Sequence, residues 1–225
     1  LIEQILSSHN KVFGADEVSF IPDLILNRFG NKNLNLFFKG VLKFDDSEFK
    51  IIGKEYHNKM NKISDKSERS TDKLPTNFQS IGFIKLILPN SRIIHCIRSP
   101  KDTILSLYKN HFPGGRIKFG YDLDELVGYY NLYSDLMSHW NRIIPDFIFN
   151  INYENLISDS EKQIRDLLNF CNLDWQNDCL TFYNNKRPIK TASDIQARKK
   201  IYNTSIDSWK NYEKYLNDYF VKLKN

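Results

Sequence analysis

Apolar and polar positions along the chain predict short strands that alternate with longer helices. Residues 92–98 (RIIHCIR) and 146–152 (DFIFNIN) are apolar over the length of one strand, and Val12–Phe13 forms a shorter apolar pair before a turn at Gly14. Apolar residues three and four positions apart predict a long helix over 122–144. Further helices are expected over residues 1–8, much of 18–70, 77–88, 160–173, 177–185 and 205–223. The alternation indicates an α/β fold with a short parallel sheet flanked by helices.

The whole chain is expected to form a single domain. Its 225 residues suit one domain of ordinary size. The sequence contains no internal repeat and no low-complexity linker. We therefore predict one domain over residues 1–225.

A strand–turn–helix unit around Arg98 is the clearest local feature. Arg98 ends the apolar strand, Ser99 can cap the next helix, and Pro100 suits that helix's first position. Asp102 completes the spacing of a capping box. The buried stripe of this helix is expected to consist of Ile104, Leu105 and Tyr108.

Arg98 and Ser106 form a candidate anion site. In an open parallel sheet, ligands bind at the carboxyl ends of the strands, where helix N-termini point at them. A guanidinium can donate two parallel hydrogen bonds to phosphate oxygens. The Ser106 hydroxyl, eight residues after Arg98, can add a further donor. The alternative is that Arg98 pairs with Asp102 and that Ser106 is only a small helix residue. The strand-end position by itself leaves this alternative ahead.

The charge balance argues against a nucleic-acid partner. The chain carries 32 Lys and Arg against 27 Asp and Glu, for a net charge of +5. The basic residues are scattered among acidic ones rather than gathered in a patch, which favours an ordinary solvated surface. No stretch approaches the roughly 18 apolar residues that a membrane span requires. We predict neither nucleic-acid binding nor a membrane span.

The cysteines and histidines do not indicate a metal site. Cys96, Cys171 and Cys179 are an odd number without CxxC spacing, which argues against a disulfide framework and a zinc site. Cys96 and Cys171 lie in apolar patterns and are expected in the core. His95 is expected there too, and the five histidines lack metal-ligand spacing. No metal is predicted.

Several segments resemble the sulfotransferase family. The run RSPKDTILS (98–106) is similar to that family's 3′-phosphate-binding signature, in which an Arg ends a strand and a Ser follows eight residues later. Four further segments are similar to bacterial sulfotransferases related to protein-tyrosine sulfotransferases, which are often attached to tetratricopeptide repeats. These segments are residues 1–17, 70–78, 150–175 and 187–216. The resemblance covers nearly the whole chain in the expected order.

The resemblance implies a P-loop-NTPase-like fold and transfer of a sulfuryl group from 3′-phosphoadenosine 5′-phosphosulfate to a hydroxyl, leaving 3′-phosphoadenosine 5′-phosphate. The acceptor would be a peptide tyrosine, a glycan or a small molecule. This chemistry needs a base, positive charge on the moving group and a grip on the nucleotide. The family resemblance also admits a homodimer.

Glu17 and Lys73 are the catalytic candidates. Glu17, in GADEVSF, corresponds to the family's base, and Asp16 is its competitor because the alignment can slip by one residue. Lys73, in TDKLPTN, corresponds to the lysine that reaches the bridging oxygen of the phosphosulfate. The structural alternatives are a helix-capping carboxylate and a solvated loop lysine.

The remaining candidates would hold the nucleotide. Tyr153 follows the second apolar strand, where its phenol can reach the phosphate side; otherwise it is an ordinary strand-end aromatic. Arg198 and Lys199 resemble the family's late basic loop, which closes over the 3′-phosphate. Trp209 is expected to anchor this loop by packing.

The family's phosphosulfate loop and its first strand would precede Leu1, and we expect both to be missing from the chain. One alternative function is a non-catalytic module of the same fold that binds a nucleotide or an anionic ligand. Another is a P-loop-type kinase, but neither a Walker lysine nor a magnesium-holding carboxylate motif is visible. Without a signal peptide and with an odd set of cysteines, a cytoplasmic location is the default expectation. That the enzyme is bacterial is implied only by the resemblance.

Overall fold

The computed structural model of the protein describes residues 1–30, 34–64, 67–112, 117–188 and 205–224. The chain forms two compact units. Unit 1 comprises Leu1–Ile93 and Leu168–Lys200, and unit 2 comprises Ile94–Leu167 and Ile201–Asn225. Each unit therefore combines two separate stretches of the sequence.

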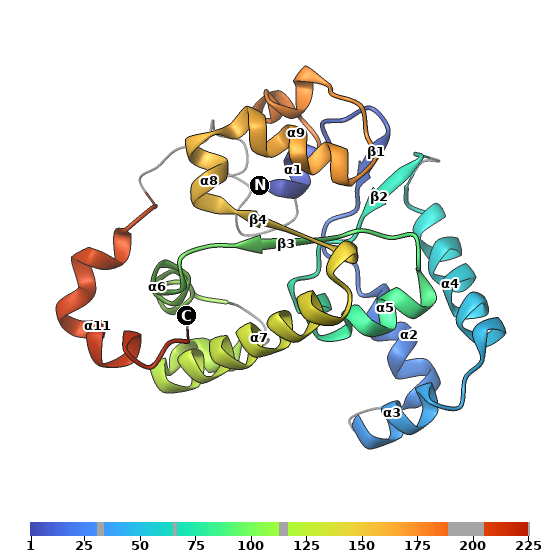
Figure 1. Ribbon diagram of the computed structural model, residues 1–225, viewed down its shortest axis with the longest axis horizontal. Helices are drawn as coiled ribbons and strands as arrows, with labels where there is room; N and C mark the ends of the chain where they lie inside the picture. The colour runs from blue at the N-terminus through green and yellow to red at the C-terminus, as the bar shows by residue number, and fades with distance from the viewer. Residues whose placement is uncertain (31–33, 65–66, 113–116, 189–204, 225) are drawn as a thin grey trace. The chain divides into compact units, whose positions relative to one another are not determined.

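In unit 1, helices surround a two-stranded parallel sheet (Figure 1). Strand β1 pairs with β2 in the register Val12 to Arg69 and Gly14 to Thr71. Because the strands are parallel, the residues after both strands emerge at the same edge. The elements are α1 (Ile2–Leu6), β1 (Val12–Gly14), α2 (Phe20–Phe29), α3 (Leu34–Val41), α4 (Asp46–Asn61), β2 (Arg69–Thr71), η1 (Pro75–Ser80), α5 (Ile81–Ile87), η4 (Asn177–Cys179) and η5 (Phe182–Asn184).

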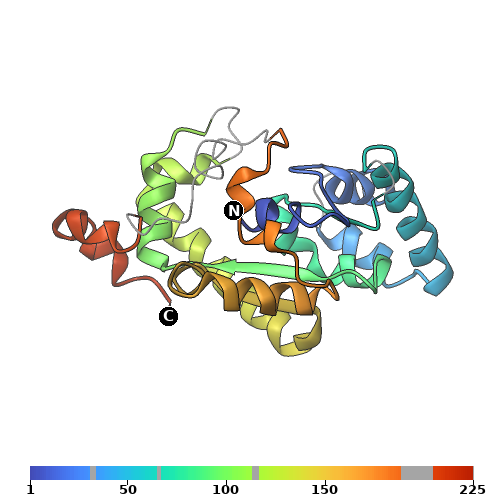
Figure 2. The same cartoon turned by 90° about the horizontal axis from the view of Figure 1, so that it is seen from above.

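Helix α4 organises one side of unit 1 by packing against α2 and α5 (Figure 2). Its start is defined by a capping box, in which Asp45 accepts from the backbone of Glu48 and Glu48 accepts from the backbone of Asp45. Its buried face has four-residue spacing, as an amphipathic helix requires. This face is formed by Ile52, Tyr56 and Met60.

Unit 2 contains a second two-stranded sheet, in which β3 and β4 run in the same direction (Figure 1). Helix α6 follows β3, and α8 follows β4. The elements are β3 (Ile93–Ile97), α6 (Pro100–Lys109), η2 (Lys118–Tyr121), α7 (Leu123–Ile143), η3 (Pro145–Phe147), β4 (Ile148–Asn152), α8 (Tyr153–Ser158), α9 (Ser160–Phe170), η6 (Ser208–Tyr212) and α11 (Glu213–Phe220). Both β3 and α9 cross a boundary between the units.

The core of unit 2 joins α6, α7 and α11. Ile104 and Leu126 are fully buried in this core, and Phe220 from the end of the chain packs with them. Trp209 packs against the same cluster, but the basic loop that it was expected to anchor lies outside the described residues. Helices distant in the sequence therefore share one apolar interior.

The expected α/β class with short parallel sheets is confirmed, and several local expectations are wrong. Strand β2 was not expected, and residues 177–185 form two 3₁₀ turns rather than a helix. Cys96 is exposed although it lies on β3, and Tyr108 is 45% exposed rather than part of the buried stripe. Among the described residues, no helix is both long and apolar enough to cross a bilayer.

The close approach of α4 and α5 generates a stability prediction. A Cβ placed on Gly53 would lie 2.2 Å from the backbone oxygen of Ile87, a clash that a rotamer change cannot relieve. We expect Gly53→Ala to lower the free energy of unfolding by about 1–3 kcal/mol, as overpacking does. Urea denaturation followed by circular dichroism measures this change.

Gly128, on α7, is the matched control. A Cβ at Gly128 meets no atom within 4 Å. Gly128→Ala should be neutral or stabilise by up to about 1 kcal/mol, because alanine is the better helix former. Equal effects of the two substitutions would contradict the close α4–α5 contact.

Candidate functional site

Unit 1 brings Glu17 and Lys73 into direct contact. Lys73 Nζ lies 2.8 Å from Glu17 Oε1, and the two side chains are 36% and 35% exposed. Glu17 follows β1 and Lys73 follows β2, so the parallel pairing of these strands places both residues at one sheet edge. Backbone contact supports the arrangement, since the Lys73 N–H donates to the carbonyl of Asp16 at 2.9 Å. The carboxylate and the ammonium are both accessible to solvent and to a ligand.

The loop that carries Lys73 is held by the partly buried carboxylate of Asp72. Tyr56 Oη donates to Asp72 Oδ2 at 3.0 Å, and Asn77 Nδ2 donates to Asp72 Oδ1 at 3.0 Å. Pro75 opens the 3₁₀ turn η1 directly after the loop. The residues around Lys73 in TDKLPTN therefore stabilise the turn that presents it.

Asp72 has a perturbed acidity for an identifiable reason. Burial raises the pKa of Asp72, although the hydrogen bonds from Tyr56 and Asn77 oppose this rise. Burial, and after it the neighbouring charge of Asp72, also raises the pKa of Tyr56. Tyr56 therefore keeps its proton at neutral pH and remains a donor to Asp72.

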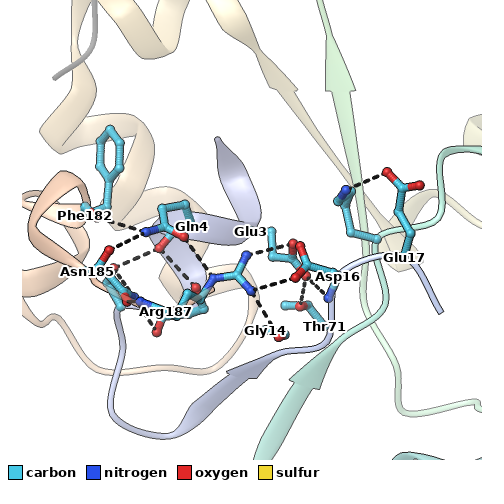
Figure 3. A network of polar contacts seen from close by, with 12 residues as sticks. Glu3, Gln4, Gly14, Asp16, Glu17, Thr71, Phe182, Asn185 and Arg187 are labelled. Atoms are coloured by element: carbon cyan, nitrogen blue, oxygen red, sulfur yellow. Dashed lines mark hydrogen bonds and ion pairs between the residues drawn. The ribbon is translucent and has the colours of Figure 1, made fainter. Parts of the chain in front are cut away.

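A buried polar network lies next to the Glu17–Lys73 pair (Figure 3). Arg187 is at its centre: its guanidinium donates to Glu3 Oε2 at 3.0 Å and lies 3.5 Å from Asp16 Oδ2. Glu3 also accepts a 2.6 Å hydrogen bond from the Thr71 hydroxyl. The carboxylates of Glu3 and Asp16 thus share one interior site with the guanidinium of Arg187, which is distant from them in the sequence.

The two acids of this network are perturbed in opposite directions. Burial raises the pKa of Glu3, but the Thr71 hydrogen bond and the charge of Arg187 together hold it below its ordinary value. Burial, followed by the charge of Glu3, raises the pKa of Asp16 above its ordinary value, against the opposing effect of Arg187. Glu3 is therefore the better stabilised anion of the two.

These surroundings distinguish Asp16 from Glu17 as candidate bases. The Asp16 residue is 8% exposed and its carboxylate faces Arg187, whereas the Glu17 side chain is 35% exposed beside Lys73. A general base must come within hydrogen-bonding distance of the proton that it removes. The geometry favours Glu17.

In unit 2, Arg98 follows β3 at the N-terminus of α6, as the sequence predicts. Its Nη2 donates to the backbone oxygen of Ser205 at 2.7 Å, and its guanidinium lies 5.3 Å from the ring centre of Tyr153. Tyr153 begins α8 directly after β4, and its hydroxyl lies 2.9 Å from the hydroxyl of Ser205. Arg98 and Tyr153 therefore lie together, and both contact Ser205.

A hollow of about 410 Å³ lies beside Arg98. Arg98 Nε is buried and has no hydrogen-bond partner among the described residues, so a donor remains for a bound acceptor. Ser106 lies in the second half of α6 and is partly exposed. The hollow is lined by Ile97, Arg98, Ser99, Pro100, Asn152, Glu154, Asn155, Ile206 and Asp207.

The carboxylate of Asp102 is bound to the chain after residue 204 instead of to Arg98. It is 1% exposed and accepts from the backbone N–H of Asp207 and of Trp209 and from the hydroxyl of Ser208, at 2.9, 3.1 and 2.9 Å. The alternative in which Arg98 pairs with Asp102 is therefore not found among the described residues. The Asp102 carboxylate likewise does not complete a capping box.

The backbone N–H of Ser99 donates to another residue. Glu154 Oε1 accepts this hydrogen bond at 2.8 Å, while the Ser99 hydroxyl accepts from the Asp102 N–H at 3.4 Å. The turn after β3 is thus held by a side chain from α8. The sequence alone does not indicate the positions of Glu154 and Arg187, because both contact residues that are distant along the chain.

Arg198 and Lys199 lie outside the described residues. Within the described ranges, no group of three or more His, Cys, Asp or Glu side chains is arranged to hold a metal ion. Burial raises the pKa of Cys171 and of Cys179 to about 11, so both thiols stay protonated at neutral pH. His95 is partly buried and hydrogen-bonds Asn150 and Tyr133 rather than packing in an apolar core.

The Tyr56–Asp72 hydrogen bond can be tested by removing one hydroxyl. Tyr56→Phe leaves the partly buried Asp72 carboxylate without its Tyr56 donor, which should lower the free energy of unfolding by about 1–3 kcal/mol. Urea denaturation measures the loss.

Tyr121→Phe is the control for this test. The Tyr121 side chain is 54% exposed, and its hydroxyl contacts only exposed groups among the described residues, such as His111 at 3.2 Å. Its loss should change stability by no more than about 0.5 kcal/mol. If Tyr56→Phe were equally neutral, the hydrogen bond would not support the Lys73 loop.

Comparisons with known proteins show the family and the fold of the chain. The model of the Sulfotransferase family matches residues 1–177. An uncharacterized protein of Aquifex aeolicus (strain VF5) is 36% identical over 223 residues; the match covers 96% of this chain and 29% of that protein. The chain therefore spans less than a third of the length of this relative.

Two solved structures share the fold. The sulfotransferase domain from the Synechococcus PCC 7002 olefin synthase superimposes with a TM-score of 0.66 at 16% identity, over 93% of this chain and 82% of that domain. The sulfotransferase domain from the curacin biosynthetic pathway superimposes with a TM-score of 0.58 at 17% identity, over 95% and 85% of the two chains. They confirm the expected P-loop-like sulfotransferase fold, and the family model, matched over most of the sequence, shows that this chain belongs to the sulfotransferase family.

Proposed function

We propose that the chain transfers a sulfuryl group from 3′-phosphoadenosine 5′-phosphosulfate to the hydroxyl of an acceptor. The observation that carries this proposal is the 2.8 Å contact between Lys73 Nζ and Glu17 Oε1 in a member of the sulfotransferase family. The two predicted catalytic residues are 56 positions apart in the sequence, and they meet at the edge of the β1–β2 sheet. A base and a cation are thereby available together.

The roles of the two side chains follow from their chemistry. Glu17 accepts the proton of the acceptor hydroxyl on a carboxylate oxygen, which makes the acceptor oxygen a better nucleophile. Lys73 places a compact positive charge where negative charge develops on the departing oxygen. When bound, the donor nucleotide supplies the sulfuryl group.

In unit 2, Arg98 and Tyr153 are the residues that we assign to the 3′-phosphate, together with Ser106. The residues suit an anion because α6 directs its N-terminus at the hollow and Arg98 keeps a buried Nε donor without a described partner. Arg198 and Lys199 remain assigned to the same phosphate by resemblance alone. The acceptor is proposed only as a hydroxyl on a peptide tyrosine, a glycan or a small molecule.

Nucleotide binding tests the unit 2 assignment. Arg98→Ala should weaken the binding of 3′-phosphoadenosine 5′-phosphate about 10- to 100-fold, because hydrogen bonds to a charged group contribute about 1.5–3 kcal/mol. Ser106→Ala should weaken binding about 2- to 10-fold, as expected for a neutral donor. Isothermal titration calorimetry on the longest form of the protein that contains this chain measures both.

Arg165→Ala is the control for this experiment, because Arg165 is exposed on α9 and pairs with Glu161 on the same helix. It removes the same charge from unit 2 and should leave the affinity within about twofold. Unchanged binding by the double variant Arg98→Ala, Ser106→Ala would overturn the phosphate assignment.

Catalysis tests the unit 1 assignment. Glu17→Gln should lower the transfer of radiolabelled sulfate to the acceptor about 10²- to 10⁴-fold, because it removes the base. Lys73→Ala should lower it about 10²- to 10³-fold. A panel of a tyrosine-containing acidic peptide, a glycan and a small phenol provides the acceptors.

Glu55→Gln is the control for the loss of a surface carboxylate, since Glu55 pairs with Arg28 away from the candidate pair. Nucleotide affinity is measured for every variant. Glu17→Gln with full turnover would place the base elsewhere. A wild-type protein that binds the nucleotide but transfers nothing to any acceptor would favour the non-catalytic module.

A further inference from the structure

Arg187 is a largely buried cation that the proposed sulfuryl transfer does not use. Its side chain is 15% exposed, and it lies after η5, far along the sequence from the residues that it contacts. The guanidinium donates to Gln4 Oε1 at 2.9 Å, to the Gly14 carbonyl at 3.1 Å and to Glu3 Oε2 at 3.0 Å. Figure 3 shows it between Gln4 on one side and Glu3 and Asp16 on the other. Several of its donors are thus directed at acceptors of the turn and helix near Glu17.

The guanidinium of Arg187 lies close to the backbone of Gly14. A Cβ on Gly14 would lie 2.6 Å from Arg187 Nη1 and 2.8 Å from its Cζ, closer than real side chains approach. The guanidinium therefore lies directly against the backbone at the end of β1. A side chain at position 14 would therefore force the Arg187 guanidinium to shift.

Asp16 is the residue that connects Arg187 to the catalytic pair. It has a left-handed backbone with φ of 58°, a conformation that few residues other than glycine adopt. Three segments hold it there: its N–H donates to Glu3 Oε1 at 2.9 Å, its carbonyl accepts from the Lys73 N–H at 2.9 Å, and its carboxylate faces Arg187. Asp16 Oδ1 is buried without a hydrogen-bond partner among the described residues. Its negative charge is compensated mainly by Arg187 and to a smaller extent by Lys73.

The same residue controls both ends of the Glu17–Lys73 contact. Glu17 directly follows Asp16, so the left-handed turn sets the direction of the Glu17 side chain. The Asp16 carbonyl binds the backbone of Lys73, so it also sets the position of the Lys73 loop. A change in the Asp16 backbone would move the two reactive groups relative to each other.

We propose that Arg187 is a positioning residue for the Glu17–Lys73 pair. By binding Glu3, Asp16 and the Gly14 carbonyl together, it holds the turn 14–17 in the conformation that places the Glu17 carboxylate against the Lys73 ammonium. The claim that Arg187 fixes the Glu17–Lys73 contact rests on the observed contacts. The claim that this affects catalysis rests on the proposed function. A merely structural arginine would stabilise unit 1 without affecting this pair.

Lysine NMR tests whether Arg187 fixes the Glu17–Lys73 contact, without any activity. The Nζ and Cε resonances of Lys73 are identified as those missing from the spectrum of Lys73→Arg. The spectrum of Glu17→Gln gives the chemical shifts that these resonances have when the ion pair is absent. In Arg187→Gln the Lys73 resonances should move most of the way to those chemical shifts. In Arg187→Lys, which keeps the charge without the planar fork, they should move part of the way.

Arg28→Gln is the matched control, because the substitution removes the same charge from unit 1. Arg28 pairs with Glu55 at 2.9 Å rather than with the network around Arg187. The substitution should leave the Lys73 resonances unchanged. All spectra are recorded well below each variant's own unfolding midpoint. If Arg187→Gln does not fold, Arg187→Lys carries the test. Lys73 resonances that do not move in the folded Arg187 variants overturn the proposal.

Turnover separates this proposal from the proposed function. Arg187→Lys should lower kcat by about 10- to 100-fold, the effect of a small misplacement of reacting groups, with nucleotide affinity within about twofold of wild type. Wild-type kcat in Arg187→Lys would overturn the positioning role. If the wild-type protein transfers no sulfuryl group while its Lys73 resonances respond to Arg187, the positioning role stands and the proposed function fails.

Discussion

The burial of Arg187 between two carboxylates is the interaction on which the arrangement of unit 1 depends. Removing a guanidinium and two carboxylates from water is costly unless each charge finds a partner. Here Glu3 and Asp16 supply the opposite charges, and Gln4 and the Gly14 carbonyl accept further hydrogen bonds. Because these partners come from α1, β1 and the turn after it, the cation joins all three.

The site of unit 2 is organised by a different device, in which backbone groups near the end of the chain bind to side chains around α6. Asp102 accepts three hydrogen bonds from residues 207–209, and Arg98 and Tyr153 both contact Ser205. The last described segment is therefore attached beside the hollow at the start of α6. The position of Arg98 at a strand end first indicated an anion site, and among the described residues its Nε donor has no hydrogen-bond partner.

Much of the local structure was predictable from the sequence. Apolar runs predicted β1, β3 and β4, and the Ser99–Pro100 pair predicted the start of α6, because strand and helix periodicity and capping act over a few residues. The prediction for Cys96 was wrong for a physical reason. An apolar strand predicts burial only if other elements cover it, and β3 is partly exposed.

The sequence by itself determined the alternation of strands and helices and the identity of Glu17, Lys73 and Arg98 as candidate residues. Only the tertiary structure decided that β2 pairs with β1, that Glu17 meets Lys73, and that Asp16 faces inward while Glu17 faces solvent. It also decided the place of Arg187, which binds Glu3 across 184 positions of sequence. Contacts of such separation leave no local pattern, because they depend on which segments pack together rather than on the spacing of neighbouring residues.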